Sequence, residues 1–548
     1  MDVKDKTYSA LILILICIWS VVLIFSIPKP QSDIQAPLLI KTNAKIGENS
    51  LTFPHSEPGS YCDSWKNTKT KTVWTDRPSA YSSLKLIDFG WNMLKSNKNG
   101  KALQFINPNN LNYDETEWKT VSKAQFQETN EALFLIPKEA NVIFTRMYWY
   151  GDSDNNNIQT ARLGIDYACP GQIFNHIPGA SAFCRKDYLQ EYILDYQRRY
   201  ASLGLFHCFT GSLTPKSYIM NEPEHCKAFI DELERQTDKF NSKNMPIEWI
   251  LKSPLQHKGY GIQLIDFEKA NYYINLYRGN LRKEINCYNV AEEDKHLIAQ
   301  KYISNPALIQ GRKFDFRVFA IIINSDPLVA LWAPENGHTR LSDQEFDKLS
   351  SDFTTHITAN VAGANPDSLE FLKSYRFNLR EIAYYFRDIL GDHEAWLERV
   401  AFPQIKKNLI HMFRSTQQNF LIKRIGLMEF YGVDFIMNDT LENIYLLESN
   451  RRPDVQEKNP NLQYREDMLL EDFSTVAEYF LKTGANSINT NEIFRSLKAF
   501  KPLIDETKND PYFGVLPIEC RIPFKDLNTN LPTDPMIAPL KHYVNSKE

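Results

Sequence analysis

The chain has 548 residues, of which 43% are hydrophobic and 13% aromatic, and a formal net charge of −4. The length allows about two to four domains, and the composition excludes a largely disordered protein. The slightly acidic balance excludes a uniformly basic nucleic-acid-binding surface. We therefore expect a globular protein with no nucleic-acid partner.

The N-terminus contains an uncharged apolar segment at residues 8–27, YSALILILICIWSVVLIFSI. Twenty such residues are enough to span a bilayer as one helix. The segment is longer than the apolar part of a signal peptide, and no A-x-A cleavage site follows it. We expect a short tail at 1–7 and then a single transmembrane anchor, with a cleaved signal peptide as the alternative. Lysines flank both ends of the segment almost equally, so the positive-inside rule does not set its orientation.

The cysteines and the glycosylation motif leave the cellular compartment open. Seven of the eight cysteines lie outside the apolar segment, which is an odd number, and none forms a CxxC pair. A zinc ribbon or a redox motif is therefore not expected. The single N-x-S/T sequon begins at Asn438, inside a strand expected at 432–439, where a glycan would be disruptive.

The first third of the chain has weak structural signals. Residues 28–60 are rich in proline and polar residues and indicate a linker. Residues 61–165 have no recognisable role, although a strand is expected from 141. A helical pattern follows at 185–201, and another at 221–241 begins with Asn221 as its expected cap. We assign 166–245 to the first part of the main folded unit.

Strands dominate the segment 246–484, which we assign to the catalytic core. The patterns predict strands at 247–253, 258–265, 297–303, 313–324 and 328–334, helices at 367–390 and 395–418, and a hairpin formed by 432–439 and 443–450. Residues 485–548 are less regular and are assigned to a tail. Strands that pair with their sequence neighbours predict an α+β fold with antiparallel sheets. The chain has no GxGxxG or GxxxxGK[ST] motif, which disfavours Rossmann and P-loop nucleotide sites.

Polar side chains occur on several of these apolar strands. Glu448 and Asn450 are two residues apart and point to one face of their strand, and a buried acid is normally paired or bound to a metal. Lys313, Asp315 and Arg317 alternate in the same way on the strand expected at 313–324, for which a solvated sheet face is the alternative reading, and Arg340 follows the strand expected at 328–334. The full set is Lys252, Lys258, Lys313, Asp315, Arg317, Arg340, Asp434, Glu448 and Asn450. Oxygen ligands suit Mg²⁺ and cations suit phosphates, so the set suits phosphoryl transfer.

These runs resemble the tubulin tyrosine ligase-like family over about residues 170–455. The similarity lies in WILKSP, KGYGI, AQKYISNPALIQGRKFDFRVFAII, DPLVALWAPENGHTR, THIT, FYGVDFIM and LLESNRRP. The resemblance implies an ATP-grasp fold and an ATP- and Mg²⁺-dependent ligase. Such an enzyme joins an amino acid to a protein carboxylate through an acyl phosphate, mostly on tubulin tails. Glutamate is the expected amino acid, and glycine and tyrosine are alternatives.

The resemblance also implies roles for individual residues. Arg317 and Arg340 would be catalytic and would stabilise the γ-phosphate and then the acyl phosphate. Asp434, Glu448 and Asn450 would bind Mg²⁺. The nucleotide-binding residues would be Lys252 at the α- and β-phosphates, Lys258, Gly259 and Gly261 in the phosphate loop, Gln300, Lys301, Tyr302 and Ile303 in the adenine hinge, and Lys313 and Asp315.

Two departures from the family pattern lead to alternatives. Ser253 separates Lys252 from the proline that usually follows it, and Ala359 follows Thr358 where the family has asparagine. The second change lies where the family contacts substrate, so the amino acid stays open. A catalytically inactive binding protein, and the same ligase acting on a non-tubulin acceptor, are the alternative functions. With the anchor, we expect a single-pass membrane protein whose body faces the cytosol and microtubules; a lumenal body is the alternative.

Overall fold

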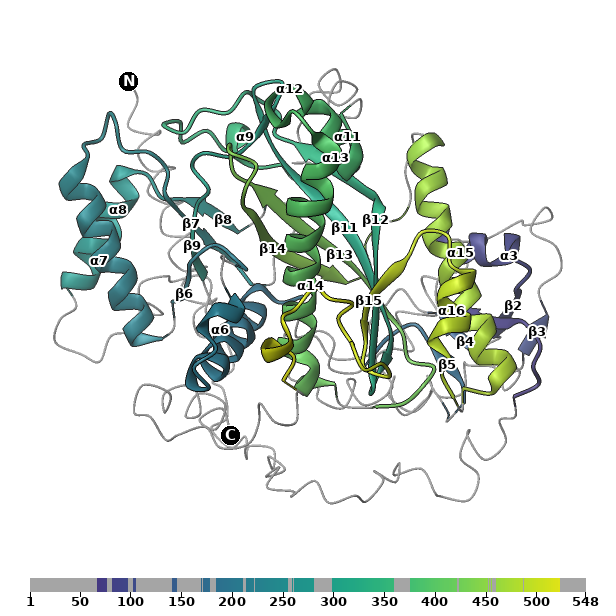
Figure 1. Ribbon diagram of the computed structural model, residues 1–548. Helices are drawn as coiled ribbons and strands as arrows, with labels where there is room; N and C mark the ends of the chain where they lie inside the picture. Colours follow the sequence, from purple (N-terminus) through teal and green to yellow (C-terminus); the bar gives the residue numbers. More distant parts are fainter. Residues whose placement is uncertain are drawn as a thin grey trace, which may run out of the picture. The chain divides into compact units, whose positions relative to one another are not determined.

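The computed structural model describes residues 67–75, 81–96, 102–104, 140–144, 169, 171–177, 184–209, 213–220, 222–254, 259, 261–279, 298–358, 375–420, 423–451, 453, 455, 460–485 and 487–522 (Figure 1). The expected anchor at 8–27, the linker at 28–60 and Lys258 lie outside these ranges. Within them, the structure has no helix whose length and hydropathy would allow it to cross a bilayer.

The central sheet is antiparallel, in the order β14-β13-β11-β12-β15. Its strands are β11 (Arg312–Ser325), β12 (Leu328–Leu341), β13 (Glu429–Met437), β14 (Ile444–Arg451) and β15 (Lys501–Asp505), and the short β10 (Leu308–Ile309) pairs with β11. The β13–β14 hairpin and the long β11 confirm the sequence predictions. Helices flank this sheet, so the predicted α+β class with antiparallel sheets is confirmed.

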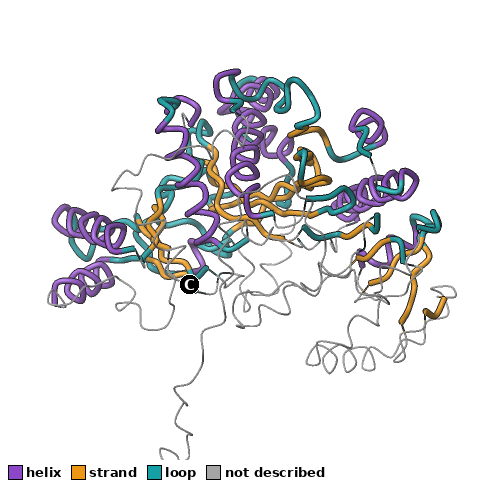
Figure 2. The backbone as a smooth tube through the Cα atoms, turned by 90° about the horizontal axis from the view of Figure 1, so that it is seen from below, coloured by secondary structure: helices purple, strands orange, loops and turns teal. Residues whose placement is uncertain are grey.

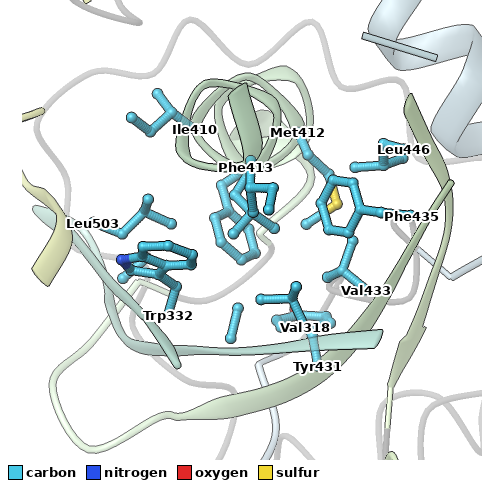
Figure 3. Packing of buried hydrophobic residues seen from close by; sticks show 14 of the residues in the cluster. Val318, Trp332, Ile410, Met412, Phe413, Tyr431, Val433, Phe435, Leu446 and Leu503 are labelled. Atoms are coloured by element: carbon cyan, nitrogen blue, oxygen red, sulfur yellow. The ribbon is translucent and has the colours of Figure 1, made fainter. Parts of the chain in front are cut away.

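The two faces of the central sheet are covered by different helices. Phe314, Phe316 and Val318 of β11 belong to the cluster beneath α14 (Phe402–Thr416), and Figure 3 shows Phe413 of that helix pointing onto the strands. Phe319 and Ile321 belong to the opposite cluster, beneath α15 (Pro460–Thr483). This alternation follows from the two-residue period of a strand. Each face therefore buries its own apolar layer.

The second strand of the sheet is longer than the sequence predicted. We expected it to end at 334, with Arg340 following it, but β12 continues to Leu341. The pairing shifts between Arg317 and Phe319, which marks a bulge in β12. A Cβ atom at Gly337 would lie 1.9 Å from the Arg317 carbonyl oxygen, so only glycine allows the two strands to approach there. The bulge lets the strand resume and brings Arg340 into the sheet.

A smaller antiparallel sheet has the order β6-β9-β7-β8. Its strands are β6 (Ser217–Ile219), β7 (Trp249–Lys252), β8 (Ile262–Leu264) and β9 (Ile298–Lys301). The helices α7 (Pro223–Lys239) and α8 (Phe267–Gly279) pack together beside it, as Figures 1 and 2 show. The sheet takes strands from both sides of the boundary that the sequence suggested at 245/246. The expected cap of α7 was wrong: Glu222 occupies the N-cap, and Pro223 starts the helix.

A third sheet, β3-β2-β1-β4-β5, takes four strands from the region of unrecognised role at 61–165 and its last strand from the segment at 166–245. It comprises β1 (Thr72–Thr75), β2 (Asn92–Ser96), β3 (Ala102–Gln104), β4 (Val142–Phe144) and β5 (Ile173–Phe174), with α3 (Tyr81–Asp88). The β2-β1-β4-β5 pairings are parallel, unlike the antiparallel pattern expected for the chain as a whole. Trp91 Nε1 donates to Ser474 Oγ of α15 at 2.8 Å, so this sheet packs on the same helix as the central sheet.

The remaining elements are short, apart from one helix beside the site. They are α6 (Lys186–Ser202), α9 (Phe353–His356), α11 (Leu379–Tyr385), α12 (Arg387–Leu390), α13 (His393–Trp396), α16 (Thr490–Ser496), the 3₁₀ turns η4 (Phe206–Phe209), η7 (Gln417–Asn419) and η8 (Ile518–Cys520), and the π-helical η6 (Leu397–Ala401). The helix predicted at 185–201 is confirmed by α6. The part of the expected tail at 487–522 packs into the core, since β15 pairs with β12.

Candidate active site

The sheet register aligns the charged residues across four strands. Asp315 of β11 lies opposite Arg340 of β12. Arg317 lies opposite Asp434 of β13, and Asp434 lies opposite Glu448 of β14. The five side chains form what we call the charged row: Arg340, Asp315, Arg317, Asp434 and Glu448.

Asp434 is the centre of the charged row. Its side chain is 1% exposed. The Asp434 carboxylate accepts two hydrogen bonds from the Arg317 guanidinium, Nε to Oδ1 at 2.8 Å and NH2 to Oδ2 at 2.9 Å. Arg340 NH2 lies 2.8 Å from the same Oδ2, and Arg340 Nε lies 2.7 Å from Asp315 Oδ1. A Cβ at Gly432 would lie 2.9 Å from Arg317 Cδ, so this glycine makes room for the arginine. Both guanidinium groups are thereby fixed in orientation.

Asn450 joins the two expected metal-binding carboxylates. Its Nδ2 donates to Asp434 Oδ2 at 3.0 Å and to Glu448 Oε1 at 3.1 Å. Two carboxylates and one amide thus converge from adjacent strands, and these are hard oxygen donors of the kind that Mg²⁺ prefers. The donor set fits the ion expected from the sequence.

Sequence reasoning missed Lys186, which begins α6. Its Nζ lies 3.3 Å from Glu448 Oε2. Burial alone would raise the pKa of Glu448, but Lys186 and Lys252 hold that pKa well below its usual range. The carboxyl is therefore ionised at neutral pH. Lys186 lies within the stretch of about 170–455 that resembles the family, and a lysine at the start of the helix predicted at 185–201 was the available signal.

Two buried lysines approach the site from different sheets. Lys252, at the end of β7, donates to Gln300 Oε1 at 2.6 Å. Lys313, on β11, donates to the His356 carbonyl at 3.0 Å and lies 4.2 Å from the centre of the Tyr302 ring. Burial lowers the pKa of Lys252 to about 8 and that of Lys313 to about 7, and repulsion from Lys252 contributes to the second shift. An anion placed between the lysines would favour their charged forms.

The expected adenine hinge lies at the end of β9. The backbone N–H groups of Lys301 and Tyr302 already donate to Lys216 and Glu248 carbonyls. The Lys301 ammonium is 2.5 Å from Glu248 Oε2, so this side chain is engaged outside the charged row. Gln300 bridges Lys252 and Ser217. The hinge thus supports the lysine, and Ile303 follows it at partial exposure.

The two glycines of the expected phosphate loop have left-handed backbone conformations. The φ angles of Gly259 and Gly261 are +80° and +67°, which other residues adopt only with strain. A Cβ at Gly259 would also lie 3.1 Å from Ile357 Cγ2. These glycines therefore have a structural requirement in the turn before β8.

The segment that departs from the family pattern reaches the charged row through Thr358. Its Oγ1 donates a hydrogen bond to Asp315 Oδ2. The other oxygen of the same carboxylate accepts a hydrogen bond from Arg340. His356, two residues earlier, bonds to the Tyr302 hydroxyl at 2.8 Å and to the Ser350 carbonyl at 2.7 Å. His356 therefore has a structural role between α9 and the hinge.

Comparison with known proteins gives the family. The model of the tubulin-tyrosine ligase family matches residues 166–480, more than half of the chain and all of the site. The chain belongs to this family. Members of the family are ATP-dependent ligases, and ATP and Mg²⁺ are their general requirements.

Individual relatives match at low identity. The chain is 27% identical over 237 residues to tubulin glycylase 3A of Drosophila melanogaster, covering 42% of the chain and 22% of the relative. It is 30% identical over 191 residues to tubulin glycylase 3C of Tetrahymena thermophila, covering 32% and 17%. It is 23% identical over 319 residues to a probable alpha-tubulin polyglutamylase of Tetrahymena thermophila, covering 56% and 72%. The chain thus spans less than a quarter of either glycylase.

Proposed function

We propose that this protein is an ATP- and Mg²⁺-dependent ligase that joins an amino acid to a protein carboxylate. The observation that carries the proposal is the charged row together with the two buried lysines. Two oriented arginines, three carboxylates and two ammonium groups converge from two sheets. Their convergence supports catalysis over a protein that only binds nucleotide.

In this proposal Asp434, Glu448 and Asn450 hold Mg²⁺, and Lys252 and Lys313 face the phosphates of ATP. The metal, when bound, neutralises charge on the transferred phosphoryl group. The turn at Gly259 and Gly261 approaches the nucleotide with its backbone. The protein contributes positioning and fixed charge, which are the main requirements of phosphoryl transfer.

The reaction has two steps. An oxygen of the acceptor carboxylate attacks the γ-phosphorus of ATP, and ADP leaves, which gives an acyl phosphate. The amine of the incoming amino acid attacks the acyl carbon, phosphate leaves with the bonding electrons, and the amine loses a proton. Arg317 and Arg340 stabilise the charge on the phosphoryl oxygens in both steps, and their pairing with Asp434 and Asp315 keeps them in place beforehand.

The relatives support a tubulin tail as the acceptor. Their names include glycylases and polyglutamylases, and we propose glutamate as the amino acid, with glycine and tyrosine as alternatives. The apolar segment 8–27 is proposed to anchor the protein in a membrane; with a cytosolic body, it would bring the enzyme to nearby microtubules. A non-tubulin acceptor is the second candidate, and a disulfide in the body favours it.

The test is mass spectrometry of acceptors after incubation with the full-length protein, ATP, Mg²⁺ and mixed amino acids. Tubulin and an acidic peptide library serve as acceptors, and Glu448→Gln is the matched variant. A mass increment with the wild type, absent with the variant, would support the ligase and identify its amino acid. ATP binding without any increment or acceptor-dependent ADP release would contradict the proposed catalysis.

A further inference from the structure

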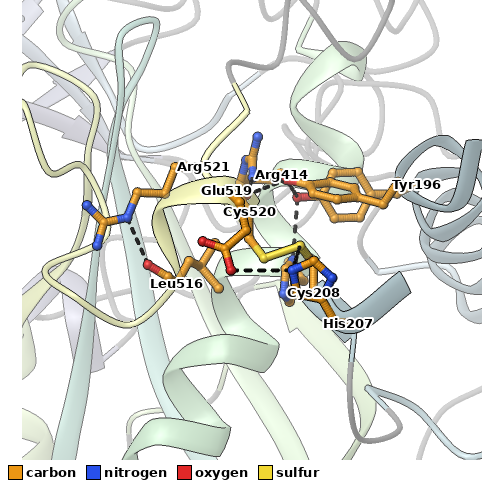
Figure 4. Close-up of a disulfide and its surroundings, with 10 residues drawn as sticks. Tyr196, His207, Cys208, Arg414, Leu516, Glu519, Cys520 and Arg521 are labelled. Carbon is orange, nitrogen blue, oxygen red and sulfur yellow. Dashed lines mark hydrogen bonds and ion pairs between the residues drawn. A yellow bond between two sulfur atoms is a disulfide. The ribbon is translucent and has the colours of Figure 1, made fainter. Parts of the chain in front are cut away.

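A buried disulfide joins two distant parts of the folded body. Cys208 of η4 and Cys520 of η8 are 312 residues apart in sequence, and their Cα atoms are 5.6 Å apart. Their exposed fractions are 2% and 0%. Figure 4 shows this disulfide, with Tyr196 on one side of it and the ion pair of His207 and Glu519 on the other. The two sulfurs are bonded to each other, so the nearby His207 does not complete a thiolate metal site with them.

Disulfides involve most of the cysteines in the described residues. Besides Cys208 and Cys520, Cys169 and Cys226 are disulfide-bonded. Structural disulfides persist in oxidising compartments and are rare in the cytosol. The cysteine pairing therefore indicates that the body folds after export from the cytosol.

The glycosylation sequon begins directly after β13 and not inside the strand as expected. Asn438 keeps one isolated antiparallel bridge to Pro306, and Asp439 and Thr440 form the turn. The strand β13 ends at Met437, and β14 begins at Ile444. In the turn between them Asp439 and Thr440 are exposed and Asn438 is partly exposed. The Asn438 side chain is partly exposed and lies beyond the last β13–β14 pair, Met437 with Ile444, so a glycan on it would not interrupt that pairing.

The side chains of the sequon are already close together. Asn438 Nδ2 donates to Thr440 Oγ1 at 2.8 Å, and Asn438 Oδ1 accepts from the Asn443 backbone N–H at 3.0 Å, both at the surface. Asn438 follows Asp434 by four residues of extended chain, or about 13 Å in the direction of β13. Modification there is compatible with an accessible charged row.

We propose that the folded body resides in an oxidising compartment and that Asn438 carries an N-linked glycan. Asn438 Nδ2 forms a bond to C1 of the first sugar of a lipid-linked oligosaccharide; the bond from C1 to the lipid diphosphate breaks, and the amide loses a proton. The apolar segment 8–27 provides the route of entry, with residues 1–7 left on the cytosolic side.

This placement distinguishes between the two acceptors considered above. An exported body does not meet cytosolic tubulin. This step rests on the proposed ligase function: the acceptor is then a lumenal or secreted protein with exposed carboxylates, and ATP and the amino acid are drawn from the same compartment.

The glycan is tested on the full-length protein expressed in cultured eukaryotic cells. Treatment with an amide-cleaving glycosidase should lower its apparent mass by one step, equal to one glycan, and should convert Asn438 to aspartate. Thr440→Ala should remove the step, whereas Thr440→Ser, which preserves the sequon, should retain it. No step in the wild type, or the same step in Thr440→Ala, would overturn the proposal.

The disulfide is tested on the same material after free thiols are blocked before lysis. A proteolytic digest should contain a peptide pair linked through Cys208 and Cys520 that separates on reduction. Blocked thiols at both positions would overturn the oxidising location. Neither measurement depends on ligase turnover, so an inactive but glycosylated and disulfide-bonded protein would contradict the proposed function alone.

Discussion

The pKa of Lys313 predicts that ATP binds more weakly as the pH rises above 7. Burial lowers this pKa to about 7 in the free protein, and an adjacent polyphosphate favours the charged ammonium. The complex therefore has a raised lysine pKa and takes up protons when it forms. Below about pH 6 both lysines are largely charged in the free protein, so affinity changes little there.

The size of the effect follows from the charged fractions. At pH 7 about one-half of Lys313 and nine-tenths of Lys252, whose pKa is about 8, are protonated; at pH 8 the fractions are about one-tenth and one-half. Affinity scales with their product if both lysines must be charged. It should fall about 10-fold between pH 7 and 8, which corresponds to about 1.4 kcal/mol.

Isothermal titration calorimetry with Mg²⁺–ATP gives both quantities needed. The dissociation constant is measured at pH 7, 7.5 and 8, and proton uptake is obtained from buffers with different ionisation enthalpies. Lys313→Arg keeps a charged group at this position, so its affinity should fall only about 2-fold over the same range, owing to Lys252. Equal pH dependence in the wild type and Lys313→Arg would refute the reasoning.

Three further predictions concern the metal donors, the bulge and the disulfide. Glu448→Gln should lower the rate of acceptor-dependent ADP release at least about 100-fold, because it removes a charge that would hold the metal; an unchanged rate would exclude Glu448 from the metal site. Gly337→Ala should lower the free energy of unfolding by about 2–4 kcal/mol, since its Cβ would overlap the Arg317 carbonyl; Gly279→Ala, with no atom within 4 Å, is the control in urea denaturation, and equal losses would contradict the explanation. Cys208→Ser should lower the free energy of unfolding by about 2–5 kcal/mol. A reductant should remove the difference between the variant and the wild type, and a difference that persists in reductant would indicate lost packing instead.

The sequence predicted best what depends on short spacing. The period of two on β11 was enough to place Lys313, Asp315 and Arg317 on one face, and Glu448 with Asn450 on another strand. Lys186 was missed because its proximity to Glu448 depends on how α6 packs against β14, which no local pattern encodes. The placement of Arg340 within β12 depends on a bulge beyond residue 334, where the predicted strand ended.

Longer-range features were less accessible. The strands of the N-terminal sheet are two to five residues long, too short to show a clear period in a polar region. The Cys208–Cys520 pairing could not be deduced, since cysteine counts allow many connectivities. The sequon was predicted to lie inside a strand because the predicted strand continued to 439, whereas Asn438 directly follows the last residue of β13.

The disulfide also changes the covalent topology of the enzyme. The chain from Cys208 to Cys520 is a closed ring, and the whole charged row, the hinge and both buried lysines lie on it. A single proteolytic cut between these cysteines opens the ring but leaves both fragments covalently joined. Such a nicked protein would keep its full mass on a non-reducing gel and separate only when reduced. The active site would therefore stay in one covalently linked molecule after a first cut by the proteases it meets.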